Sequence, residues 1–181
     1  MKNSARKTAL SLRRKLTSDL RNDYSHIIQG KLMASEWYVN AKNILCYASY
    51  NSEVNTACII KDILSSDKNL FLPRCITDKH ELVICPVNSL DELKKGAYGI
   101  IEPDGPGVDI NVIDLVIVPI VAYNENRMRI GYGAGYYDRL LSGSCVKTIG
   151  IAFSVQKTMF DEFEPTDVRL DMIITEGEVL K

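Results

Sequence analysis

The feature that most constrains the fold is an unbroken apolar run from Leu115 to Tyr123. A strand with one face in water alternates polar and apolar residues, and this run does not. Both of its faces are therefore expected to be covered, as in a central parallel strand between layers of helices. Pro119 cannot donate a hydrogen bond to a neighbouring strand, so it requires a strand end, a bulge or a sheet edge. The run predicts an α/β sandwich.

The rest of the chain follows the same pattern. Residues 4–39 contain no proline and repeat leucine and isoleucine at helical intervals, which predicts two helices with a break at 17–19, where Thr17 or Ser18 can cap a helix. Short runs rich in branched and aromatic residues predict strands, with helical stretches at 55–64 and 136–141. Besides 115–123, the predicted strands are 44–50, 70–72, 82–87, 148–153 and 172–175. We expect one domain over residues 1–181.

Composition excludes several classes of protein. The chain has 22 lysines and arginines against 23 acidic residues, so no overall positive field favours general nucleic-acid binding. No run approaches the roughly 18 apolar residues of a membrane span, and the basic start lacks the apolar segment of a signal peptide. Five cysteines without a C-x-x-C pair indicate a reducing compartment, and two histidines exclude a three-histidine zinc site. We expect a cytoplasmic protein that binds neither nucleic acid nor membrane.

The densest chemical signal lies in residues 127–139, directly after the buried run. Glycines at 131, 133 and 135 weaken both helix and strand, so they predict a loop whose backbone N–H groups converge on an anion. A helix begins near Tyr136, and Arg129 supplies a full positive charge. The spacing matches neither the dinucleotide nor the Walker pattern. A glycine-rich connector without a ligand remains the alternative.

Other candidate residues have an ordinary explanation beside the functional one. Glu53 follows a strand end and can face a substrate there, or it can lie in the first turn of the next helix. Asp138 suits a helix start whatever the function. Lys2 and Arg6 share one helix face and are by default solvated charges. Asp167 and Asp171 are either an exposed turn or magnesium ligands.

Taken together, these residues resemble the 5-formyltetrahydrofolate cyclo-ligase family, also called methenyltetrahydrofolate synthetase. The strongest element is residues 129–138, RIGYGAGYYD, which is close to the family pattern R-x-G-x-G-x-G-Y-Y-D. Supporting segments occur in family order along nearly the whole chain. They are Lys2 with Arg6, then residues 53–56, 72–74, 99–103, 118–119, 150–156 and 167–171.

The resemblance implies a three-layer α/β/α fold with a mostly parallel central sheet and an N-terminal helical segment. It also implies an enzyme that uses ATP and Mg²⁺ to close the formyl group of 5-formyltetrahydrofolate into 5,10-methenyltetrahydrofolate, releasing ADP and phosphate. The enzyme is expected to be a monomer or a weak homodimer with this small molecule as its partner.

The family's site residues carry over to matching positions in this chain. Arg129 and Tyr137 are implied to be catalytic, and Asp138 and Asp171 to ligate magnesium. The ATP site is implied to contain Lys2, Arg6, Arg129, Gly131, Tyr132, Gly133, Ala134, Gly135, Tyr136 and Tyr137. The folate site is implied to contain Ala48, Glu53, Tyr132, Gly133, Gly135 and Tyr136.

The chain departs from the family pattern at three positions. Ala134 stands where relatives often have glycine or lysine, Asn124 where aspartate is frequent, and Asp167 lacks a preceding histidine. Two other functions stay open at this point. One is a regulatory protein that binds folate and nucleotide without turnover, and the other is a sugar-phosphate isomerase or acyl-CoA-type enzyme on a similar layered fold.

Overall fold

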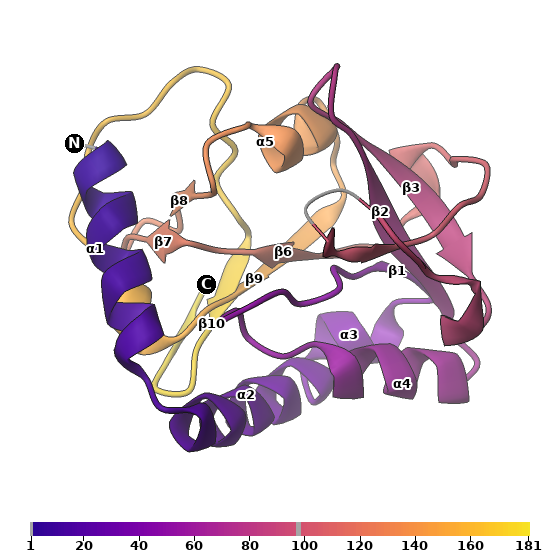
Figure 1. Cartoon of the computed structure of the whole chain (residues 1–181), viewed down its shortest axis with the longest axis horizontal. Coiled ribbons are helices and arrows are strands. Elements are labelled where there is room, and N and C mark those ends of the chain that lie inside the picture. The colour runs from indigo at the N-terminus through magenta and orange to yellow at the C-terminus, as the bar shows by residue number, and fades with distance from the viewer. Residues whose placement is uncertain (1, 97–98) are drawn as a thin grey trace.

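The computed structural model describes residues 2–96 and 99–181 and is built around a twisted, mostly parallel sheet (Figure 1). Within these residues the main sheet has seven strands in the order β11-β10-β9-β6-β1-β2-β3. The two outer pairs, β2 with β3 and β10 with β11, are antiparallel, and the inner pairs are parallel. The strands are β1 Asn43–Leu45, β2 Asn69–Ile76, β3 Glu81–Val87, β6 Leu115–Pro119, β9 Lys147–Ile151, β10 Met172–Ile174 and β11 Val179–Leu180.

Strand β6 lies in the middle of the sheet, between β1 and β9, as its apolar run predicts. Leu115 and Ile117 pack on one face of the sheet, and Val116 and Val118 pack on the other. All four side chains are fully buried. A strand covered on both faces needs no polar alternation, which explains the composition of the run.

The predicted strand 115–123 is two strands. Pro119 is the last residue of β6, because it has no N–H with which to continue the ladder. The chain then enters a separate hairpin, in which β7 Ala122–Tyr123 pairs with β8 Arg129–Ile130. This hairpin leads directly into the glycine-rich segment.

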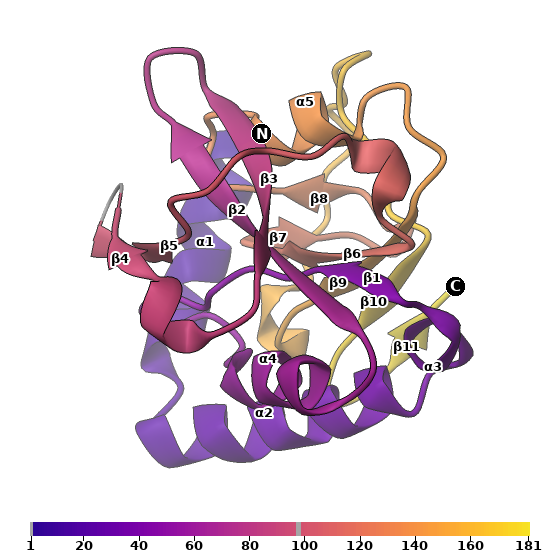
Figure 2. The same cartoon turned by 90° about the vertical axis from the view of Figure 1, so that its right-hand side faces the viewer.

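Helices cover the two faces of the sheet unequally (Figures 1 and 2). One core joins the sheet to α2 Ser18–Met33 and α4 Ala57–Ser65, through Ile28 and Leu32 of α2 and Ile59 and Ile63 of α4. The opposite core contains Leu141 of the six-residue helix α5 Tyr136–Leu141, together with loop residues. The predicted three-layer α/β/α arrangement is confirmed, with a thin second helical layer.

The N-terminal segment contains three helices where the sequence predicts two. The break at 17–19 is confirmed, because Thr17 caps α2 by accepting a hydrogen bond from the Leu20 N–H at 3.2 Å. A short third helix, α3 Glu36–Asn40, follows and is capped by Ser35. The predicted helix 136–141 is α5, and the predicted helix 55–64 is α4 with a later start.

Several short elements escaped prediction. They are the edge strand β11, the strands β4 Lys94–Lys95 and β5 Ile101–Glu102, which pair with each other, and the 3₁₀ helices η1 Leu90–Glu92, η3 Ile110–Val112 and η4 Ser154–Gln156. The predicted strand 44–50 ends at Leu45, after which the chain leaves the sheet.

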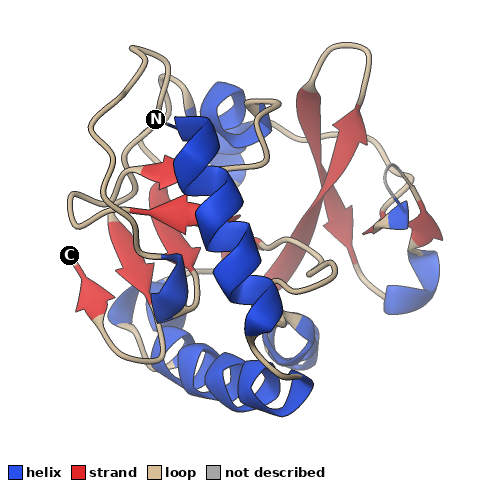
Figure 3. Cartoon of the chain, turned by 60° about the vertical axis from the view of Figure 1, so that its left-hand side comes forward, coloured by secondary structure: helices blue, strands red, loops and turns tan. Residues whose placement is uncertain are grey.

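Helix α1 Lys2–Lys15 does not cover the sheet but crosses beside the β7–β8 hairpin (Figure 3). Ala9 of α1 is fully buried in a small core with Ala122, Ile130 and Phe160. This packing brings the first turns of the chain next to the segment that follows β8. Among the described residues, no helix combines the length and apolar character needed to cross a bilayer.

The sheet topology marks one place for a ligand. From β1 the chain proceeds to β2 on one side, and from β6 it proceeds to β9 on the other. The carboxyl ends of β1 and β6 therefore form a switch point, where connections leave in opposite directions. In open α/β sheets, ligands bind in the crevice outside such a point.

Candidate functional site

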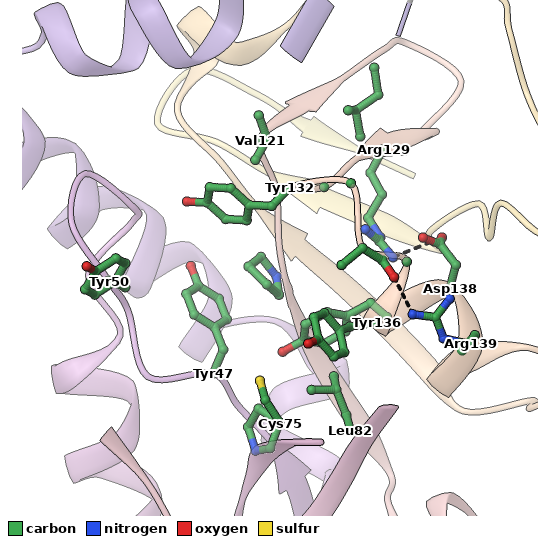
Figure 4. Close-up of a pocket in the computed structure, with 18 of the residues that line it drawn as sticks. Tyr47, Tyr50, Cys75, Leu82, Val121, Arg129, Tyr132, Tyr136, Asp138 and Arg139 are labelled. Atoms are coloured by element: carbon green, nitrogen blue, oxygen red, sulfur yellow. Dashed lines mark hydrogen bonds and ion pairs between the residues drawn. The ribbon is translucent and has the colours of Figure 1, made fainter. Parts of the chain in front are cut away.

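A cavity of about 880 Å³ lies at this switch point (Figure 4). Tyr47 and Ala48 line it from the segment after β1, and Pro119 and Val121 line it from the end of β6. Residues 129–139, which contain the glycine-rich loop, form a further wall. Several sequence-predicted site residues thus meet in one space, and Asp171 is not among the residues that line it.

The three glycines of the loop lie against three different guanidinium groups. A Cβ at Gly131 would lie 3.2 Å from Arg129, one at Gly133 would lie 3.5 Å from Arg6, and one at Gly135 would lie 2.9 Å from Arg139. Gly133 and Gly135 also have positive φ angles of 113° and 70°, which side chains rarely adopt. The absence of a side chain at Gly131 and Gly135 therefore lets Arg129 of β8 and Arg139 of α5 approach the loop backbone, and Arg6 of α1 lies beside Gly133.

Arg6 and Arg139 are held in place by backbone carbonyls. Arg6 Nε donates to the Gly131 carbonyl at 2.8 Å. Arg139 Nη2 donates to the Ala134 carbonyl, and its Nε donates to the His80 carbonyl at 2.8 Å. Arg139 thereby fastens the tip of the β2–β3 hairpin to the glycine loop. These contacts orient the guanidinium groups, and no acidic partner neutralises either one within the described residues.

Arg129 lies behind the loop and is 7% exposed. Its Nη2 pairs with Asp138 Oδ1 at 3.0 Å, and its guanidinium lies over the Tyr137 ring at 5.7 Å. Burial lowers the pKa of Arg129, and the Asp138 carboxylate opposes that shift. Arginine remains charged in proteins, so the cavity keeps a buried cation.

Two buried polar atoms at this wall lack a hydrogen-bond partner in the described part of the chain. They are Arg129 Nε and the Tyr137 hydroxyl, and both residues line the cavity. Burial raises the pKa of Tyr137, so its hydroxyl remains protonated and able to donate. Unpaired buried donors are costly, and a ligand oxygen in the cavity would satisfy them.

Two carboxylates stand at the same end of the cavity. Asp138 accepts a hydrogen bond from the Val168 N–H at 3.3 Å in addition to its ion pair, and Asp167 pairs with Lys2. Lys2 also pairs with Glu164 at 3.2 Å. Burial lowers the pKa of Lys2, but its two acidic partners together raise it by more, so the net shift is upward.

The predicted metal pair of Asp138 and Asp171 is not brought together at the cavity. Asp171 Oδ2 instead accepts hydrogen bonds from the Thr148 N–H at 2.9 Å and the Thr148 hydroxyl at 2.8 Å. These bonds hold the start of β10 against β9, so Asp171 stabilises the sheet. The other acidic side chains that line this part of the cavity are Asp167 and Glu164, which both pair with Lys2.

The opposite end of the cavity is aromatic and contains Glu53. Glu53 Oε1 accepts from the Tyr132 hydroxyl at 3.0 Å, and Oε2 accepts from the Tyr50 N–H at 2.9 Å. The alternative that Glu53 lies in the first turn of a helix is wrong, because α4 begins at Ala57. Figure 4 shows Tyr47, Tyr50 and Tyr132 on one side of the cavity and the Arg129–Asp138 pair on the other.

Glu53 is more easily protonated than an ordinary glutamate. Burial raises its pKa above the usual value of 4.5. The Tyr50 N–H, the Arg13 charge and the Tyr132 hydroxyl each lower it without cancelling the shift. A carboxylate with such an environment in a cleft is typical of a functional group.

Comparison with known proteins decides the family. The profile of the 5-formyltetrahydrofolate cyclo-ligase family matches residues 1–176. The chain belongs to this family.

Several members of this family match the chain over nearly all of their own length. A 5-formyltetrahydrofolate cyclo-ligase of Mycoplasma genitalium is 31% identical, over 97% of this chain and 98% of the relative. The solved structure of a 5,10-methenyltetrahydrofolate synthetase of Aquifex aeolicus superposes with a TM-score of 0.86 at 30% identity, covering 98% of this chain and 91% of that one. The synthetase of Mycoplasma pneumoniae gives a TM-score of 0.79 at 28% identity, covering 97% and 98%.

Sequence reasoning missed Arg13 and Arg139 in this family member. Arg13 is 2% exposed and donates to the Tyr132 hydroxyl at 2.8 Å, so it holds the tyrosine that contacts Glu53. A signal for Arg13 was present, since it follows Arg6 by seven residues and shares a helix face with it and with Ala9. The position of Arg139 depends on the distant His80 carbonyl, and no local spacing indicates it.

A comparison of two glycines tests the anion-binding role of the loop. Gly135 and Gly143 have φ angles of 70° and 73°, but a Cβ at Gly143 meets nothing within 4 Å. Both alanine variants carry left-handed strain of about 1–3 kcal/mol. Only Gly135→Ala displaces Arg139. Loss of one charge-assisted contact costs about 1.5–3 kcal/mol, so the affinity for inorganic tripolyphosphate should fall about tenfold or more.

Calorimetric titration of both variants with tripolyphosphate measures this effect. Gly143→Ala should bind as the unaltered protein does. Equal affinities in the two variants would contradict the contribution of Arg139 and the loop.

Proposed function

We propose that this protein catalyses the ATP- and Mg²⁺-dependent cyclisation of 5-formyltetrahydrofolate to 5,10-methenyltetrahydrofolate, with release of ADP and phosphate. The observation that carries the proposal is the division of one cavity into two ends. One end combines a glycine loop, guanidinium groups and carboxylates, and the other combines aromatic side chains with Glu53. An anionic nucleotide and a flat, polar-edged ring system require such different surroundings. Membership of the cyclo-ligase family supports the binding of a nucleotide and a folate in one cavity.

The chemistry explains why a phosphate donor must lie beside the folate. An N-formyl group is a poor electrophile, because its oxygen is a poor leaving group. Transfer of the γ-phosphoryl group to the formyl oxygen converts that oxygen into part of a phosphate. N10 then attacks the formyl carbon, its proton is lost, and the carbon–oxygen bond breaks. The formyl oxygen leaves within inorganic phosphate, and the new carbon–nitrogen bond closes the ring.

Phosphoryl transfer asks the protein mainly for positioning and for neutralisation of charge on the phosphoryl oxygens. We assign these tasks to the backbone of Gly131–Tyr137 and to the guanidinium groups of Arg6, Arg129 and Arg139. Lys2 adds a fourth cation at the same end. The Tyr137 hydroxyl and Arg129 Nε are the unpaired donors that phosphate oxygens would satisfy.

The donor set at this end fits Mg²⁺. This ion is commonly held by one or two carboxylates together with substrate phosphates, and Asp138 and Asp167 supply two carboxylates. When bound there, Mg²⁺ would neutralise phosphate charge and polarise the transferred group. Lys2 and Arg129 hold these carboxylates in place by ion pairs.

The aromatic end is assigned to the folate. Glu53 is placed to accept hydrogen bonds from the substrate's ring system, and Tyr132 and Tyr50 fix the position of its carboxylate. Ala48 and Tyr136 line the same cavity and provide contact surface. Hydrogen bonds to a charged group of this kind contribute about 1.5–3 kcal/mol each.

The direct test mixes purified protein, ATP, Mg²⁺ and 5-formyltetrahydrofolate. The expected result is the near-ultraviolet absorbance of the methenyl product, with one ADP formed for each product molecule. Binding of both ligands without that absorbance would instead indicate a regulatory binding protein. Product formation without ATP consumption would overturn the phosphorylation step.

Three aspartate variants test the metal assignment. Asp138→Asn and Asp167→Asn should each raise the Mg²⁺ concentration for half-maximal activity by about tenfold or more. Asp171→Asn is the matched control, because its amide oxygen can still accept both bonds from Thr148, each weakened by about 1 kcal/mol by loss of the charge, and the side chain does not line the cavity. Magnesium titrations of activity and thermal unfolding curves separate the two effects. An increased magnesium requirement in Asp138→Asn and Asp171→Asn, with none in Asp167→Asn, would restore the sequence-based assignment.

The raised pKa of Glu53 predicts a dependence on pH. The group binds its proton more tightly than an ordinary glutamate, so the carboxylate is lost as pH falls through a value above 4.5. The kcat/KM for the folate should therefore decline on the acid side with Glu53, and Glu53→Gln should flatten that decline while lowering the plateau. Glu125→Gln, an exposed control, should leave the profile unchanged. Persistence of the same acid decline in Glu53→Gln would assign it to another group.

A further inference from the structure

A second hollow, of about 450 Å³, adjoins the outside of the aromatic end of the cavity. Three arginines from α1 and the start of α2 line it together with polar side chains of the loop before α4. The lining residues are Leu10, Arg13, Arg14, Arg21, Asn51, Ser52 and Tyr132. Neither the family pattern nor the proposed reaction uses Arg14, Arg21 or Asn51.

The charged side chains that line this hollow are all positive. Within residues 2–96 and 99–181, none of the three arginines forms an ion pair. Arg13 Nε donates to the Ser52 hydroxyl at 3.0 Å, and Arg21 donates to the Leu16 carbonyl, so their partners are neutral. Arg14 is exposed. Unneutralised guanidinium groups that converge on a concave surface attract oxyanions.

The hollow adjoins the reaction cavity at Tyr132. Tyr132 lines both, and its hydroxyl lies between Arg13 on one side and Glu53 on the other. The loop before α4 is divided in the same way, because Tyr50 and Glu53 line the cavity while Asn51 and Ser52 line the hollow. Asn51 has a φ of 54°, which turns the backbone at this point. A ligand that crosses the Tyr132 edge therefore reaches both spaces.

The proposed substrate has anionic groups at the end remote from its reacting ring. 5-Formyltetrahydrofolate ends in a glutamyl group with two carboxylates, and each further γ-linked glutamate adds one more. The nucleotide phosphates are a second source of oxyanions, but Arg129 and Asp138 lie at the other end of the cavity from Tyr50 (Figure 4). Proximity to the folate end favours the carboxylates.

We propose that this arginine-lined hollow binds the glutamyl tail of the folate, through its carboxylates, outside the reaction cavity. The inference rests on the proposed function for the identity of the ligand. Arg14 and Arg21 supply the contacts, while Arg13 positions Tyr132 between the two spaces. Each added glutamate should strengthen binding, and salt should weaken that gain, because the hollow is partly open to solvent.

The test uses the Arg14→Gln/Arg21→Gln double variant, which keeps Arg13 and every residue assigned to the reaction. Its control is Lys7→Gln/Lys15→Gln, which removes two exposed charges from α1 outside the hollow. The KM values for monoglutamyl and pentaglutamyl 5-formyltetrahydrofolate and for ATP are measured at low and high salt. The arginine variant should reduce the advantage of the pentaglutamyl substrate by about fivefold, as two partly exposed ion pairs would. Its kcat, the KM for ATP and the control should not change.

Each other outcome has a definite meaning. A raised KM for ATP with an unchanged tail-length effect would assign the hollow to nucleotide phosphates and overturn the tail assignment. An unchanged tail-length effect and an unchanged KM for ATP would overturn the anion site itself. If the unaltered protein forms no methenyl product, the proposed function fails, and calorimetric titration with the two folates then tests the hollow independently. If both double variants lose the pentaglutamyl advantage equally, the effect comes from general surface charge and the proposal is wrong.

Discussion

The approach of three guanidinium groups to a loop with glycine at alternate positions is the interaction on which the site depends. Arg6, Arg129 and Arg139 belong to α1, β8 and α5, and they meet at the loop because Gly131, Gly133 and Gly135 leave room for them. A Cβ at Gly131 or Gly135 would crowd a guanidinium group, and a side chain at Gly133 or Gly135 would strain the backbone. The glycine spacing therefore reflects cation packing as well as loop conformation.

The sheet puts this loop where a ligand can reach it. Pro119 ends the central strand β6, and the chain turns into the β7–β8 hairpin above the carboxyl ends of β6 and β1. Helix α1 then packs on that hairpin through Ala9, which delivers Lys2 and Arg6 to the loop. The N-terminal helix is thus part of the binding wall, although it contributes little to the main core.

The parts of the structure that local pattern determines were predictable from the sequence. The apolar run at 115–118 identified the central strand, and the residues 136–141 identified α5, because burial on both faces and helix periodicity leave direct marks on composition. The sequence indicated that Pro119 interrupts the hydrogen bonding of the strand, but it did not predict the β7–β8 hairpin that follows. The motif at 129–138 indicated residues of one site, and the structure places all of them on the wall of the cavity.

What the sequence could not provide are contacts between long side chains from distant segments. Asp167 and Asp171 are equivalent by spacing, and only the Thr148 donors on β9 distinguish the structural aspartate from the one in the cavity. Likewise, Arg13 looks like any basic residue of α1 until its bonds to Ser52 and Tyr132 are seen. These pairings depend on how α1 and the loop before α4 meet in three dimensions.

The most direct test of the account is a crystal structure of this protein with a non-hydrolysable ATP analogue, Mg²⁺ and 5-formyltetrahydrofolate together. The account predicts the terminal phosphate within hydrogen-bond distance of the amides of Gly131–Tyr137, with the formyl oxygen facing it and the metal on Asp138 and Asp167. A triphosphate bound elsewhere, with the glycine loop free of ligand, would contradict it.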